Sequence, residues 1–191
     1  MIPNWTDKGI IPPINYLSPT SSQRSPYQVS LSDVILKYGT SLKRNQILMG
    51  LLNFRKELHA IGIIKGFQWI DGSFLENIEM LEGRPPNDID IVNFYYIPDG
   101  LSQKELVIRN SKIFDPILIK ENFQVDGYFV SLSQSSPERL INRTSYWYSM
   151  WSHKRDESWK GFLQIDLSPT DDEAARANLN TNLNLVEEEL K

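Results

Sequence analysis

The sequence predicts one mixed α/β (α+β) domain, with a β-sheet of about four strands packed against helices and an extended N-terminal arm. Three observations predict this class. Some segments repeat apolar residues every three or four positions, whereas others are short runs of Ile, Val and Phe, so helices and strands alternate. The 191 residues suffice for one domain with a substantial core. The 40% hydrophobic and 23% charged residues are typical of an ordinary globular domain.

The first 29 residues are expected to form the arm. Five prolines fall within this segment, and each fixes its own φ and lacks an N–H donor, so a regular element is disfavoured. The aromatic residues Trp5, Tyr16 and Tyr27 indicate that the arm lies against something: its own domain or a neighbouring subunit. We therefore expect a homo-oligomer or a partner protein, with an arm folded back on its own domain as the alternative.

The folded domain is expected to span residues 30–191. Ser30 and Asp33 form a helix-start pattern, and the helix ends at Gly39. Strands are expected at 66–71, 88–96, 123–132 and 161–167, and helices at 30–38, about 45–61, about 73–81, about 102–110, 137–151 and 170–190.

Charge and composition exclude several classes of protein. The last 23 residues hold six acids and two bases, which leaves 18 of each in residues 1–168. A neutral body does not favour broad nucleic-acid binding, although a short contact stays open. No apolar run approaches the roughly 18 residues of a membrane span, and the N-terminus lacks an export pattern. The chain has no cysteine. We expect a cytoplasmic protein without a membrane partner.

Two aspartates stand out in the segment Asn87-Asp-Ile-Asp-Ile-Val. Residues two apart on a strand share one face, so Asp88 and Asp90 project together while Ile89 enters the core. Two neighbouring carboxylates repel each other unless a cation lies between them. Mg²⁺ is commonly held by one or two carboxylates together with substrate phosphates. A solvated strand edge is the alternative for this pair alone.

A second motif precedes this pair. Gly72 and Ser73 follow an apolar strand and are expected to begin a helix, where free N–H groups bind anions. Gly72 would let phosphates approach the backbone, and Ser73 would add a hydroxyl. We interpret the neighbouring Asp71 as a turn residue.

In this order, the two motifs resemble the DNA polymerase β-like nucleotidyltransferases, and most closely the small bacterial (minimal) enzymes of toxin–antitoxin and phage-defence operons. The resemblance covers about residues 45–130, and the 14-residue spacer between Ser73 and Asp88 is slightly long for the family. It implies that Asp88 and Asp90 bind Mg²⁺ or Mn²⁺ and that Gly72 and Ser73 bind the nucleotide.

The family's third acid is implied to be Asp126, as metal ligand or base, with Asp166 as the alternative. The implied activity is transfer of a nucleoside monophosphate from a nucleoside triphosphate to a hydroxyl of protein, nucleic acid or a small molecule. The alternative is a degenerate module of the same fold that only binds nucleotide or scaffolds a partner. The sequence does not identify the acceptor.

Overall fold

A five-stranded mixed sheet forms the centre of the computed structural model, which describes residues 1–133 and 136–189 and only the backbone of 185–189. The strand order is β1-β5-β2-β3-β4, with β2 antiparallel to both neighbours and the pairs β1/β5 and β3/β4 parallel. The mixed α+β class is thereby confirmed. The strands are β1 (Tyr27–Gln28), β2 (Gly66–Asp71), β3 (Ile89–Tyr95), β4 (Val125–Ser131) and β5 (Leu163–Asp166).

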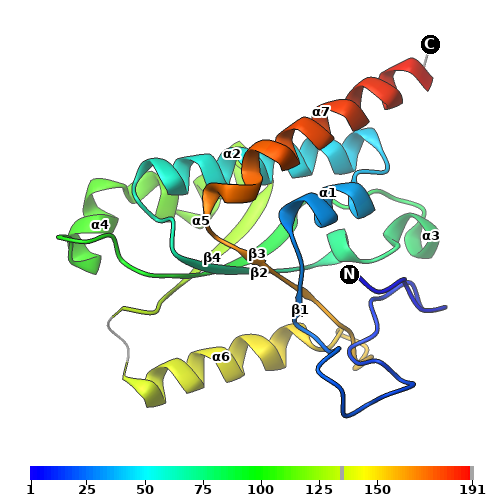
Figure 1. Cartoon of the computed structure of the whole chain (residues 1–191), viewed down its shortest axis with the longest axis horizontal. Coiled ribbons are helices and arrows are strands. Elements are labelled where there is room, and N and C mark those ends of the chain that lie inside the picture. Colours follow the sequence, from blue (N-terminus) through cyan, green and yellow to red (C-terminus); the bar gives the residue numbers. More distant parts are fainter. Residues whose placement is uncertain (134–135, 190–191) are drawn as a thin grey trace.

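Helices cover both faces of this sheet. Figure 1 shows α1, α2 and α7 on one side and α6 alone on the other. The helices are α1 (Leu31–Tyr38), α2 (Leu42–Ala60), α3 (Ile78–Glu82), α4 (Gln103–Arg109), α5 (Pro116–Phe123), α6 (Pro137–Trp151) and α7 (Asp172–Glu189). Within the described ranges, none of them combines the length and the apolar character that crossing a membrane requires.

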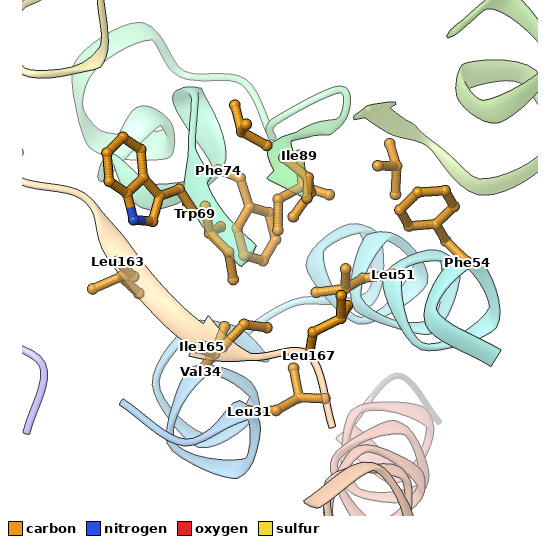
Figure 2. Packing of buried hydrophobic residues seen from close by; sticks show 14 of the residues in the cluster. Leu31, Val34, Leu51, Phe54, Trp69, Phe74, Ile89, Leu163, Ile165 and Leu167 are labelled. Carbon is orange, nitrogen blue, oxygen red and sulfur yellow. The ribbon is translucent and has the colours of Figure 1, made fainter. Parts of the chain in front are cut away.

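The main core lies between the sheet and α1, α2 and α7. Leu51 and Phe54 of α2 and Val34 of α1 are fully buried, and Ile165 of β5 lies in the same core from the side of the sheet (Figure 2). Arg55 is also buried, and it donates hydrogen bonds to both carboxylate oxygens of Asp172 at 2.9 and 2.6 Å. This ion pair joins α2 to the start of α7.

Aromatic residues fill the opposite face beneath α6. Trp147 and Trp151 are buried, and their rings contact Tyr128 of β4 and Phe162, respectively. Because α6 follows β4 and runs back across the sheet, its C-terminal end and the following loop approach the end of β2.

The N-terminal segment packs against its own domain. Ile2, Ile10 and Ile11 are buried, and the Trp5 indole N–H donates to the Leu75 carbonyl at 2.7 Å. Residues Tyr27–Gln28 form strand β1 beside β5, so the expectation of an arm without secondary structure and of about four strands was wrong. The two-residue strand escaped prediction because its neighbour, not its own composition, fixes it.

Candidate functional site

Three aspartates form a row across β2, β3 and β4 at one end of the sheet. Asp71 ends β2, Asp90 lies near the start of β3, and Asp126 lies near the start of β4. The sheet register places Asp71 opposite Asp90 and Asp90 opposite Asp126. Register partners project from the same face, and the two-residue period adds Asp88 to it. The predicted site residues Asp88, Asp90 and Asp126 are thus brought together.

Gly72 lies directly against this row. Its φ is +87°, and a Cβ at this position would lie 1.8 Å from Asp90 Oδ2. Only glycine permits this approach, because a side chain would collide with the carboxylate and strain the backbone. The strand end therefore holds a main-chain segment in contact with the Asp90 carboxylate.

Ser73 follows at once, but it opens a different element from the one predicted. A three-residue 3-10 turn spans Ser73–Leu75, and α3 begins only at Ile78. The expectation of one helix over 73–81 was wrong, because Glu76 adopts extended backbone and interrupts it. A single turn carries little helix dipole, so an anion here would depend on individual N–H groups and the hydroxyl.

Buried Arg44 of α2 holds this turn in place. Its guanidinium donates to the carbonyls of Phe74 at 2.6 Å and Glu76 at 2.8 Å, and it pairs with both carboxylate oxygens of Glu79. The carbonyls of the turn are thereby satisfied from the protein interior.

Negative charge accumulates at Asp90. Burial of Asp90, which is the largest cause, and the charges of Asp88 and Asp126 together raise the pKa of Asp90 to about 6. The ammonium of Lys120, on α5, lies 2.7 Å from Asp88 Oδ2 and 3.3 Å from Asp126 Oδ2. Hydrogen bonding to Asp88 raises the pKa of Lys120, so the lysine is charged. Its single charge faces three carboxylates.

Asp71 has its own counter-ion. Both Asp71 oxygens accept hydrogen bonds from Lys160 Nζ at 2.7 Å, and both side chains are almost fully buried. Burial raises the pKa of Asp71 to about 7, and Lys160 opposes this shift. Lys160 also lies 3.7 Å from Glu76, which pairs with Lys154 at 3.0 Å. The interpretation of Asp71 as a turn residue was wrong.

Asp166 does not join this group. It pairs with Phe67 in the sheet register, four residues before Asp71 on β2, which corresponds to about 13 Å along the strand. Its side chain is exposed and accepts a hydrogen bond from the Ser168 backbone N–H at 2.6 Å. The structure therefore places Asp126, and not the alternative Asp166, beside Asp90.

The donor chemistry of the row suits a divalent cation. Among the described residues, no group of three His, Cys, Asp or Glu side chains is arranged so that it could hold a metal ion. The ammonium of Lys120 lies between two of the acids, Asp88 and Asp126. The carboxylates of Asp88, Asp90 and Asp126 nevertheless carry more negative charge than Lys120 balances. Oxygen ligands of this kind are those that Mg²⁺ and Mn²⁺ prefer. These three residues would hold the ion.

Neither lysine of the site was predicted. Lys120 lies six residues before Asp126 and Lys160 lies 89 residues after Asp71, so neither shares a local motif with its partner. A charged side chain gives no sequence signal of burial unless its partner is known. Only the apolar neighbours Gly161 and Phe162 hinted that Lys160 enters a buried strand.

Comparison with known proteins places the chain in a family without assigning a function. No curated protein and no solved structure matches it. Residues 3–166 match the model of a family described as a family of unknown function (DUF6932). The matched range contains the N-terminal segment, the Gly72–Ser73 turn, the aspartate row and both lysines. The chain belongs to the DUF6932 family.

Proposed function

We propose that this protein is a metal-dependent nucleotidyltransferase with a nucleotidyltransferase-like sheet. The observation that carries the proposal is the row of Asp90 and Asp126, flanked by Asp88, with the Gly72 main chain pressed against Asp90. The resemblance of the Gly-Ser and Asp-x-Asp motifs to polymerase β-like enzymes supports it. A role in toxin–antitoxin or antiviral defence rests on that resemblance alone.

In this proposal the substrates are a nucleoside triphosphate and an acceptor hydroxyl. The hydroxyl oxygen forms a bond to the α-phosphorus, the bond from that phosphorus to the pyrophosphate oxygen breaks, and the hydroxyl proton leaves. Asp88, Asp90 and Asp126 hold Mg²⁺ or Mn²⁺, and Asp126 lies at the edge where it accepts the proton. The bound cation supplies neutralisation of the phosphate charge. The Gly72–Ser73 backbone and hydroxyl orient the phosphates.

One observation favours a second candidate. The ammonium of Lys120 lies beside two of the three acids, so the protein itself supplies part of their counter-charge. This arrangement suits a degenerate module that binds nucleotide or a partner without turnover. The two candidates differ in pyrophosphate release. The transferase and a module that binds nucleotide both require metal-dependent nucleotide binding, whereas a module that only scaffolds a partner does not.

The decisive experiment incubates the protein with each α-labelled nucleoside triphosphate and Mg²⁺ or Mn²⁺. Pyrophosphate release is measured, and label is sought on protein, RNA, DNA and small molecules. Asp88→Ala, Asp90→Ala and Asp126→Asn should each lower the transfer rate by orders of magnitude without unfolding, because these carboxylates lie on a sheet face outside the apolar core.

Asp166→Asn is the matched control, because it changes an aspartate on the same face at the other end of the sheet. It should retain transfer. Loss of transfer in Asp166→Asn alone, or full transfer in the Asp88 and Asp90 variants, would show that the site is assigned wrongly.

A further inference from the structure

Lys120 occupies the space between two of the carboxylates. Its ammonium nitrogen is 2.7 Å from Asp88 Oδ2 and 3.3 Å from Asp126 Oδ2, so the two oxygens share one cation. The lysine comes from the last turn of α5, whereas its partners lie at the starts of β3 and β4. Three elements therefore meet at this ammonium group.

We propose that Lys120 is an exchangeable internal counter-ion: it holds Asp88 and Asp126 together until a divalent cation displaces it. This inference rests on the proposed function. A cation bound to both oxygens would lie about 2.0–2.1 Å from each if it were Mg²⁺. That position overlaps the volume of the ammonium group, so the lysine and a bridging cation exclude each other.

Displacement of this side chain requires little rearrangement. The Lys120 side chain is 51% exposed, and the structure gives its ammonium no hydrogen-bond acceptors among the described residues besides these two aspartates. Ion pairs at such exposed positions contribute little free energy, so water can replace the contact. The Asp71–Lys160 pair is different, because its side chains are 5% and 7% exposed and cannot open in this way. Of the two lysines of the site, only Lys120 can move away from its carboxylate partners without opening a buried ion pair.

The consequence is competition between Lys120 and the metal. Removing the ammonium frees two carboxylate oxygens and leaves Asp88 and Asp126 without their ion-pair partner. The metal-free protein should therefore lose stability while its affinity for a divalent cation rises. If Lys120 had only a structural role, its removal would lower stability without increasing the affinity for metal.

The test measures binding of Mn²⁺ alone, without nucleotide, to the full chain by titration calorimetry and by the loss of the free-ion electron paramagnetic resonance signal. Lys120→Met should bind Mn²⁺ about two- to fivefold more tightly than the wild type, as expected for removal of an exposed competing ion pair. The Mn²⁺-induced rise in Tm should also be larger in the variant.

Two control variants distinguish the direct contact of Lys120 with the carboxylates from the general effect of removing one positive charge. Lys43→Met removes a lysine whose ammonium, within the described part of the chain, donates to Gln124 Oε1 alone, at 2.7 Å, and it should leave Mn²⁺ affinity unchanged. Lys154→Met removes a charge paired with Glu76, away from the three acids, and should have a smaller effect than Lys120→Met. Circular dichroism checks that each variant is folded.

Unchanged or weaker Mn²⁺ binding by Lys120→Met, with binding by the wild type intact, would overturn the role of Lys120 and leave the proposed function standing. An equal gain in Lys154→Met would likewise overturn it. If neither the wild type nor Lys120→Met bound Mn²⁺, the metal-dependent function itself would fail. Binding by the variant alone would support the inference.

Discussion

At the scale of single residues, the protonation state of Asp90 affects the stability of the metal-free protein. Burial, together with the charges of Asp88 and Asp126, raises its pKa from 3.8 to about 6. The folded state therefore binds this proton more tightly than the unfolded state. The contribution of Asp90 to stability is greatest below about pH 4 and is lost as the pH rises through 6.

Asp90→Asn should remove this pH dependence, since an amide is neutral throughout. Thermal unfolding of the wild type and the variant in a chelating buffer, from pH 4 to pH 8, measures the difference. The variant should gain stability relative to the wild type between pH 4 and pH 7. A constant difference over this range would contradict the raised pKa. Mg²⁺ should reduce the difference in stability between the variant and the wild type at pH 7, because the cation binds the ionised carboxylate that only the wild type has.

Lys160 offers a second test at this scale. Lys160→Met leaves the Asp71 carboxylate buried without a counter-charge, which should cost about 3–5 kcal/mol of unfolding free energy. The double variant Asp71→Asn/Lys160→Met should recover part of this loss, because no buried charge remains. Urea denaturation of the three proteins measures both effects. Equal stability of Lys160→Met and the wild type would mean that the pair is not buried in solution.

Some of these residues could be predicted from the sequence and others could not. The two-residue period placed Asp88 and Asp90 on one face, and the resemblance to polymerase β-like enzymes implied Asp126 rather than Asp166. Asp71, Lys120 and Lys160 could not be found in this way. Their proximity depends on the sheet register and on where α5 and the loop before β5 pack, and neither follows from local spacing.

At the scale of elements, the junction between β2 and the 3-10 turn determines the geometry of the site. Gly72→Ala should disrupt it, because the added Cβ would lie 1.8 Å from Asp90 Oδ2. Gly83→Ala is the matched control: its φ of +64° is also left-handed, but nothing lies within 4 Å of the added atom. Gly83→Ala carries left-handed backbone strain of about 1–2 kcal/mol, whereas Gly72→Ala combines the collision with a positive-φ extended conformation (φ +87°, ψ −175°) that is essentially restricted to glycine.

We expect Gly72→Ala to lower Tm more than Gly83→Ala and to weaken Mn²⁺ binding severalfold, whereas Gly83→Ala should leave Mn²⁺ binding unchanged. Differential scanning fluorimetry and calorimetry give the two quantities. Identical behaviour of the two alanine variants would show that Gly72 does not approach Asp90 closely.

Prediction of elements from the sequence succeeded where the pattern was long and failed where packing decides. The Ser30–Asp33 capping box and the apolar face of α2 are both present. Helix α5 was missed: its Asp115 cap and the proline at its start lie in a segment whose periodicity spans only eight residues. Strand β1 was missed because two residues contain no period. Short elements depend on their neighbours.

At the scale of the whole molecule, the two faces of the sheet have different roles. The face beneath α1, α2 and α7 carries the apolar core, and the other face carries the aspartate row and the aromatic packing of α6 (Figure 1). The aspartate row lies at one end of its face, beside the loop that follows α6. A partner or second subunit that supplies the acceptor would approach this end, and oligomerisation stays a prediction.

The N-terminal segment completes the fold, and its removal should be costly. A chain that begins at Ser30 loses the buried Ile2, Ile10 and Ile11, and strand β1 no longer covers the edge of β5. Burial of one such side chain contributes about 1.5–3 kcal/mol, so the three together rival the 5–15 kcal/mol that stabilises a typical domain.

We therefore expect the shortened chain to unfold at much lower temperature than the full chain and to aggregate through its uncovered strand edge. Thermal unfolding measures the first effect, and light scattering of both chains measures the second and reports the oligomeric state. The milder variant Trp5→Phe deletes the indole hydrogen bond to Leu75 and part of the ring contacts with Tyr38 and Arg44, and it should lower the unfolding free energy by at least about 1 kcal/mol. If the shortened chain matched the full chain in Tm and mass, the N-terminal segment would be dispensable, and the packing of its isoleucines would contribute nothing to stability.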